Sequence, residues 1–189
     1  MPVHIGAKAH DFSDPMGLLS DCHRRIEMFL GVLQGIAGVI DRPLSEENAK
    51  ALDSALQYFR QAAPKHNADE EESLFPRMRR IRQPEMRSAI AKVEGLEKDH
   101  RWAAPLHEEI ERLGRIRLSG SSLTGTEIAM FREAVDELAE MYREHIRVED
   151  EAVFPVAARL LPDADRKAIG EEMAVRRNIR PTGAGAKPA

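Results

Sequence analysis

Apolar residues recur every three or four positions along four long segments of the chain, which is the spacing of one face of an α-helix. No comparable run alternates apolar and polar residues as a half-buried strand would. In the first segment the apolar stripe consists of Met16, Leu19, Ile26, Leu30, Leu33, Ala37 and Ile40. The pattern therefore predicts a protein built from long amphipathic helices.

Capping residues and prolines set the ends of these helices. A proline directly after a capping residue begins a helix, and Thr124 with Glu127 forms a capping box. The four predicted helices run from Pro15 to about Ile40, from Ser45 to about Ile81, from Pro84 to about Leu118, and from Thr124 to about Leu161. Because short loops join them, they predict an all-α, antiparallel, up-down-up-down four-helix bundle over residues 14–161.

The two ends of the chain lie outside this predicted bundle. Residues 1–13 form an N-terminal extension. Residues 162–189 are predicted to hold a short helix, Asp165 to about Arg176, followed by a disordered tail from Pro181 onward. We therefore expect one folded domain with two short additions.

Composition and charge exclude several classes of function. With 28 basic and 32 acidic residues, the net charge of −4 provides no basic surface for nucleic acid. A single cysteine, Cys22, permits neither an intrachain disulfide nor a thiolate metal cage. No stretch approaches 18 apolar residues and the N-terminus lacks a signal pattern. We therefore expect a cytoplasmic protein with no nucleic-acid or membrane partner.

Ionisable residues interrupt the apolar stripe of every helix, and they do so in a repeated pattern. A shift of 79 positions places His66 and Glu70 onto His145 and Glu149, and a shift of 77 places His23 onto His100. In each His-x-x-x-Glu pair the two side chains lie one helical turn apart and point the same way. A pseudo-twofold axis between the two halves would bring all six side chains to one centre.

Four imidazoles and two carboxylates at core positions require compensation. Burying an unpaired charge costs several kcal/mol, and leaving a buried polar group without a hydrogen bond costs about 1–3 kcal/mol. The free energy of unfolding of a typical protein is only about 5–15 kcal/mol. Metal ligation supplies that compensation. Mixed imidazole and carboxylate ligands suit iron, manganese or zinc, and six of them suit two bridged ions better than one tetrahedral ion.

Some of these signals are weak when taken singly. A lone histidine on an apolar face is more often a hydrogen-bonded core residue than a ligand, and His-x-x-x-Glu also occurs at His23/Glu27 and His107/Glu111. His107 is a further candidate ligand, two turns from His100, and its ligation is left open. Pro105 lies between these two histidines and could kink or bulge the helix there.

The motifs resemble those of the hemerythrin family, in particular bacterial hemerythrin-like HHE cation-binding domains. The matching pieces are Asp21–Glu27, His66–Pro76, Asp99–His100 and His145–Pro155. The resemblance implies an oxo- or hydroxo-bridged di-iron centre ligated by His23, His66, Glu70, His100, His145 and Glu149. Asp150 is an alternative to Glu149 as the bridging carboxylate. Oxygen carriers of this family have a second histidine where this chain has Ala104, so reversible oxygen carriage is not implied.

These residues support two main hypotheses of function. In the first, a di-iron protein binds or reduces a small oxidant such as dioxygen, peroxide or nitric oxide, for sensing, detoxification or repair of iron centres. In the second, the chain is a non-catalytic, iron-responsive or iron-holding module whose fold depends on metal. A ferritin-like oxidase ranks lower, because Glu-x-x-His occurs only at Glu97/His100, and a metal-free interaction domain is the remaining alternative. The sequence leaves a homodimer open.

Overall fold

The structure is a computed structural model that describes residues 10–179 of the 189. Within that range it contains helices and no strand, which confirms the prediction of an all-helical bundle. The predicted disordered tail from Pro181 and the first nine residues lie outside the described residues. No helix in the described range is both long and apolar enough to cross a membrane.

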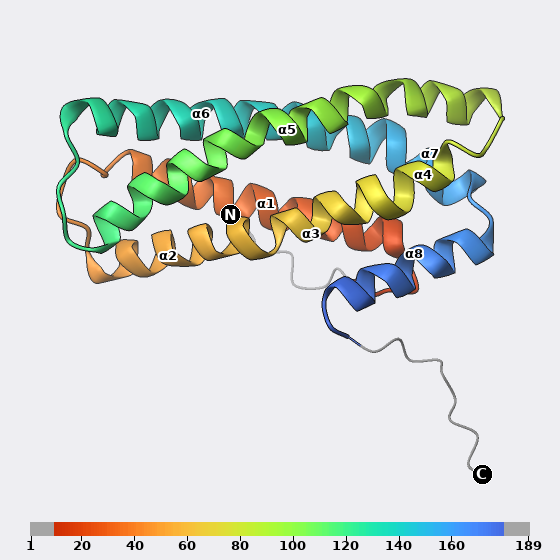
Figure 1. The fold of residues 1–189 in the computed structure, drawn as a ribbon, viewed down its shortest axis with the longest axis horizontal. Coiled ribbons are helices and arrows are strands. Elements are labelled where there is room, and N and C mark those ends of the chain that lie inside the picture. The colour runs from red at the N-terminus through yellow and green to blue at the C-terminus, as the bar shows by residue number, and fades with distance from the viewer. Residues whose placement is uncertain (1–9, 180–189) are drawn as a thin grey trace, which may run out of the picture.

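Four helical rods lie side by side and a shorter helix, α8, packs beside them (Figure 1). Two of the rods are single helices and two are interrupted by a π-helical turn. The elements are α1 (Pro15–Ala37); α2 (Glu46–Gln61), α3 (Ala63–Ala68), η1 (Asp69–Leu74) and α4 (Phe75–Met78); α5 (Pro84–Leu118); α6 (Gly125–Val148), η2 (Glu149–Val153) and α7 (Phe154–Leu160); and α8 (Asp163–Arg176). The contacts between α1 and α2, α2 and α5, α5 and α6, and α6 and α1 close a ring of four neighbours.

The predicted helix starts agree with the observed caps. The Asp14 side chain accepts a hydrogen bond from the Gly17 amide, and both halves of the capping box between Thr124 and Glu127 are present. The first helix ends at Ala37, earlier than predicted, because Gly38 follows it and the chain continues in turns closed by bonds between residues three apart. Helix α8 begins at Asp163, two residues earlier than predicted, directly after the extended Pro162.

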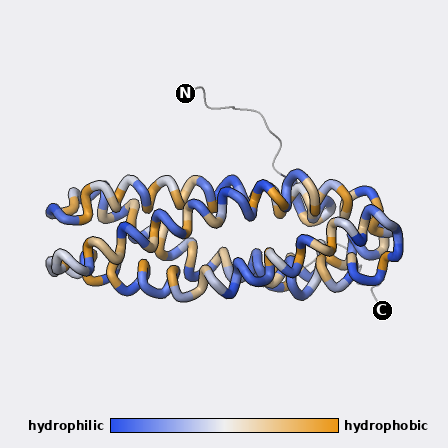
Figure 2. The backbone as a smooth tube through the Cα atoms, turned by 90° about the horizontal axis from the view of Figure 1, so that it is seen from above, coloured by the Kyte–Doolittle hydropathy of each residue, from blue (hydrophilic) through white to orange (hydrophobic). Residues whose placement is uncertain are grey.

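Two apolar clusters occupy the two ends of the bundle, and the ionisable residues lie between them. The first cluster includes Leu33, Leu56 and Leu138, and the second includes Phe75 and Phe154. Figure 2 shows hydrophobic and hydrophilic positions alternating along each rod, as expected of amphipathic helices. The same helices therefore line the whole core, but a group of ionisable side chains separates its two apolar parts.

The π turns are the main feature that the sequence analysis did not predict. In η1 the Phe75 amide donates to the Glu70 carbonyl, and in η2 the Phe154 amide donates to the Glu149 carbonyl, so each bond spans five residues instead of four. A proline follows each phenylalanine and has no amide to continue the normal ladder. The bulge considered near Pro105 is not observed, because α5 continues as α-helix through that residue.

Candidate metal centre

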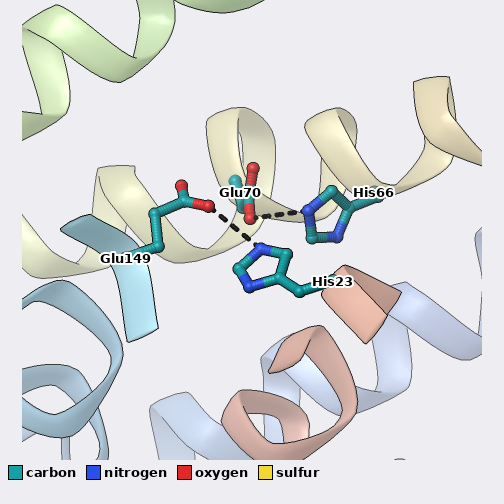
Figure 3. A group of neighbouring side chains, drawn as sticks. All are labelled: His23, His66, Glu70 and Glu149. Carbon is teal, nitrogen blue, oxygen red and sulfur yellow. Dashed lines mark ion pairs between the residues drawn. The ribbon is translucent and has the colours of Figure 1, made fainter. Parts of the chain in front are cut away.

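The fold brings six of the seven candidate ligands to one place in the middle of the bundle. Two overlapping groups have ligand atoms that all lie within 4.8 Å of one another: His23, His66, Glu70 and Glu149 in the first, and Glu70, His100 and His145 in the second. All six residues are buried, and the two glutamates have no exposed surface. Figure 3 shows the first group, with both carboxylates and both imidazoles turned toward one another.

Each glutamate contacts one histidine of each half of the repeat. Glu70 Oε1 lies 3.2 Å from His66 Nε2 and Glu70 Oε2 lies 3.5 Å from His100 Nε2. Glu149 Oε2 lies 3.0 Å from His23 Nε2 and 3.3 Å from His145 Nε2. The two carboxylates therefore stand between the imidazole pairs, which is the position that a bridging ligand occupies between two cations.

The residue after each glutamate supports a histidine from behind. Glu71 Oε1 lies 2.7 Å from His100 Nδ1, and Asp150 Oδ1 lies 3.1 Å from His23 Nδ1. The wider π turn places successive acidic side chains on the inner and outer sides of the same imidazole group. A carboxylate at the outer nitrogen fixes the tautomer and aims the other nitrogen inward. Asp150 thus lies behind His23, while Glu149 joins the cluster.

The outer nitrogens of the other two histidines differ. His145 Nδ1 lies 3.2 Å from Asp99 Oδ2. The buried Nδ1 of His66 has no hydrogen-bond partner among the described residues. The shift of 77 that relates the two halves places Cys22 at the position of Asp99. All four inner nitrogens therefore lie near a glutamate, but only three of the four outer nitrogens lie near a carboxylate.

The electrostatics of the cluster fit a cation better than an apolar core. Burial and the neighbouring Glu149 carboxylate raise the pKa of Glu70 well above its usual range. Burial also disfavours the charged form of Glu149, but His145 and His23 outweigh it and lower the pKa of that carboxyl. Burial lowers the pKa of His66. Histidine nitrogens lie 3.0–3.5 Å from three of the four carboxylate oxygens, but none of the four has a partner with good hydrogen-bond geometry among the described residues. A cation between them would satisfy these lone pairs.

His107, the seventh candidate, does not join the cluster. Its Nε2 lies 3.0 Å from the Tyr142 hydroxyl, and its ring packs 4.9 Å from the Phe59 ring. Burial lowers the pKa of His107 to about 4, so the imidazole is neutral at pH 7. The structure thus places His107 beside Phe59 and Tyr142, two members of the apolar cluster that includes Leu33, and not among the clustered candidate ligands.

Several residues that support the site were given no role by the sequence analysis. Glu71 and Asp99 contact the outer nitrogens, and Asp69, which has no exposed surface, binds Arg176 of α8 and Arg177 directly after it. The signal for Glu71 and Asp99 is their adjacency to Glu70 and His100 in the repeated motifs. Nothing in the local sequence links Asp69 to α8, because that contact joins residues more than a hundred positions apart.

Comparison with known proteins agrees with this geometry. The family model of the hemerythrin HHE cation-binding domain matches residues 14–157, which is most of the chain and includes all six clustered residues. A protein of Haemophilus influenzae, described only as uncharacterized, is 24% identical over 170 residues, covering 89% of this chain and 93% of the relative. The match to the family model ends before α8 begins.

Proposed function

This chain belongs to the hemerythrin HHE cation-binding domain family. On that basis we propose that its buried cluster holds two iron ions and that the protein binds or reduces a small oxidant. Dioxygen, peroxide and nitric oxide are the candidate oxidants. The antiparallel up-down-up-down arrangement of four helices and the cytoplasmic location are part of this proposal. The ring of contacts among α1, α2, α5 and α6 supports the helix arrangement.

The observation that carries the proposal is the place of the two glutamates. Glu70 and Glu149 each lie within 3.5 Å of one histidine from each half of the repeat. A carboxylate that lies beside both pairs of histidines could bind an ion at each pair, whereas two independent single-ion sites would each have their own carboxylate. Each ion would have two imidazoles, one pair being His23 and His66 and the other His100 and His145, with both carboxylates between the pairs. Nitrogen and oxygen donors of this kind suit iron, with manganese or zinc as alternatives.

The chain's own residues would prepare the site for such chemistry. Bound iron would supply reversible one-electron chemistry and positions at which a small oxidant can bind. Glu71, Asp99 and Asp150 hold the imidazoles in a fixed tautomer through their outer nitrogens. The apolar clusters at both ends enclose the buried centre between them, so they would limit its access to water. Ala104, where oxygen carriers of the family have a histidine, leaves one fewer protein donor on α5.

Metal analysis and spectroscopy of the purified protein test this function. Protein isolated without oxygen and without added metal is expected to contain about two iron ions per chain. Its absorption spectrum should change on exposure to dioxygen, peroxide or nitric oxide. His66→Ala should lose iron while the control Trp102→Phe, an exposed residue outside the cluster, keeps it. A colourless protein that retains only zinc would contradict the proposal.

A metal-holding module without redox function is the second candidate, and one observation favours it. The four unsatisfied carboxylate oxygens and the buried Nε2 of His23 make the metal-free core costly. Metal should therefore stabilise the fold strongly, whatever its chemistry. If removing iron melted the bundle while all three oxidants left its spectrum unchanged, this second function would replace the first.

A further inference from the structure

Helix α8 lies beyond the residues that match the family model, yet it is packed into the bundle. Ile169 and Met173 have no exposed surface and belong to the apolar cluster that includes Phe75 and Phe154. Gly170 approaches the Phe12 carbonyl so closely that a Cβ atom there would lie 1.9 Å from the oxygen. This close fit gives α8 a fixed position against the domain.

Two arginines at the end of α8 reach the π turn η1. Arg176 Nη1 donates to Asp69 Oδ1 at 2.8 Å, and Arg177 Nη2 donates to Asp69 Oδ2 at 2.6 Å. Arg176 also donates through Nη2 to Ser73 Oγ at 2.8 Å and to Glu72 Oε2 at 3.2 Å. The arginine pair therefore contacts η1 near both its ends, and each carboxylate oxygen of Asp69 has its own guanidinium.

The place of Asp69 in the chain connects these contacts to the metal centre. Asp69 directly precedes Glu70, and neither residue has any exposed surface. A buried carboxylate is stable only when it is paired, so Asp69 stays inside because the two guanidiniums neutralise it. Any shift of the Asp69 backbone would move the Glu70 carboxylate, which is shared by both groups of candidate ligands.

Among the described residues, no pair of arginines from another helix contacts the second π turn. The shift of 79 that relates η1 to η2 places Val148 at the position of Asp69 and Ala152 at the position of Ser73. Neither side chain can bind a guanidinium through an ion pair. The arginine contacts are thus a property of one turn and are not required for forming a π turn as such.

We propose that Arg176 and Arg177 are positioning residues for the metal centre, and that they act through Asp69 to hold η1 and with it the Glu70 carboxylate. This inference rests on the proposed function in one respect, namely that Glu70 is a metal ligand. It gives a role in metal binding to a helix outside the matched domain. Residues that orient ligands from outside typically change metal affinity by about 10- to 100-fold.

The test measures how tightly the metal-free protein binds Co²⁺, whose absorption spectrum reports on the ligands around it. The variants are Asp69→Asn and the double change Arg176→Gln with Arg177→Gln. The matched control is Arg80→Gln, which removes a 3.0 Å contact between Asp165 of α8 and an arginine outside η1. Both test variants should bind Co²⁺ about 10- to 100-fold more weakly with an altered absorption spectrum, and the control should match the wild type.

The melting temperature of the metal-free protein separates positioning from simple stabilisation. If α8 only stabilised the fold, the variants would melt earlier but would bind Co²⁺ with wild-type affinity and spectrum at low temperature; that result would overturn the inference. Arg177→Lys keeps the charge and should bind more tightly than Arg177→Gln, and equal affinities would also contradict it. A wild-type protein that binds no Co²⁺ would overturn the proposed function, and this inference with it.

Discussion

The two π turns share a sequence motif and a position relative to the candidate metal ligands, but they are supported differently. Each turn contains a buried glutamate followed by a second carboxylate that contacts the outer nitrogen of a histidine. Turn η1 is additionally tied to α8 through Asp69, whereas η2 has Val148 at that position. A duplicated His-x-x-x-Glu motif therefore sets the same inner geometry twice, while the surroundings of the two copies differ.

The divergence extends to the histidine that precedes each glutamate. His145, in the half containing η2, has Asp99 at its outer nitrogen. His66, in the half containing η1, has no partner at Nδ1 among the described residues, and Cys22 stands at the related position. The half that contacts α8 through Asp69 is thus the half whose His66 has no carboxylate at its outer nitrogen. Substitutions at related positions test how far the two halves are equivalent.

The largest effect is expected from the two glutamates themselves. Glu70→Gln and Glu149→Gln should each weaken binding of both metal ions, because each carboxylate contacts a histidine of both pairs. The loss should exceed the about 10- to 100-fold typical of residues that only orient ligands. Elemental analysis of the purified variants measures it. Retention of one full equivalent of metal by either variant would show that the carboxylates are not shared.

The second effect concerns the apolar residues that the repeat places at equivalent positions in the two turns. Leu74 and Val153 are related by the shift of 79, and neither has exposed surface. Leu74→Ala should lower the free energy of unfolding by about 2–5 kcal/mol, and Val153→Ala should lower it less because fewer carbon atoms are removed. Urea unfolding of the metal-free proteins provides the measurement. A larger loss at Val153 would mean that η2 depends more on packing than η1 does.

The third prediction compares the residues behind His145 and His66. Asp99→Asn should weaken metal binding by about 10- to 100-fold, since His145 loses the carboxylate that orients its ring. Cys22→Ser should change the affinity less, because the His66 Nδ1 atom has no partner to lose. Titration with Zn²⁺ against a competing chelator measures both. Equal effects at the two positions would indicate that Cys22 supports His66 after all.

The smallest expected effect is a pH dependence of stability caused by His107, whose counterpart in the other half is Leu30. Burial lowers the pKa of His107 to about 4 in the folded protein from an unperturbed value of 6.5. Between these values the unfolded chain binds the proton and the folded chain does not, so stability falls as the pH falls below about 6.5. At pH 5 the loss should be about 1–2 kcal/mol.

The measurement for His107 is urea unfolding of metal-free protein at pH 7 and pH 5, with His107→Leu as the comparison. The difference between wild type and variant isolates this residue from the other histidines. The wild type should lose more stability than the variant over that interval. Equal losses would place the folded-state pKa of His107 near its ordinary value.

The sequence predicted the helices, and which ionisable side chains share a buried helix face, because both depend on spacing within one helix. Helical periodicity identified the stripes, caps identified the starts, and the repeated His-x-x-x-Glu motif identified Glu70 and Glu149. It did not predict the π turns, because a proline alone does not decide one: Pro76 and Pro155 follow π turns, whereas Pro105 lies in continuous α-helix. It left His107 open, because only the neighbouring Tyr142 and Phe59 decide where that ring points.

The order of residues along the chain is enough to predict amphipathic helices whose buried faces carry imidazoles and carboxylates. These are local properties, since the helical period dictates which side chains share a face. The packing of the helices settles which carboxylate lies between the imidazoles and which lies behind them. It also brings Asp69 to Arg176 and Arg177. Those outcomes depend on distances between segments far apart in the chain, which no local spacing specifies.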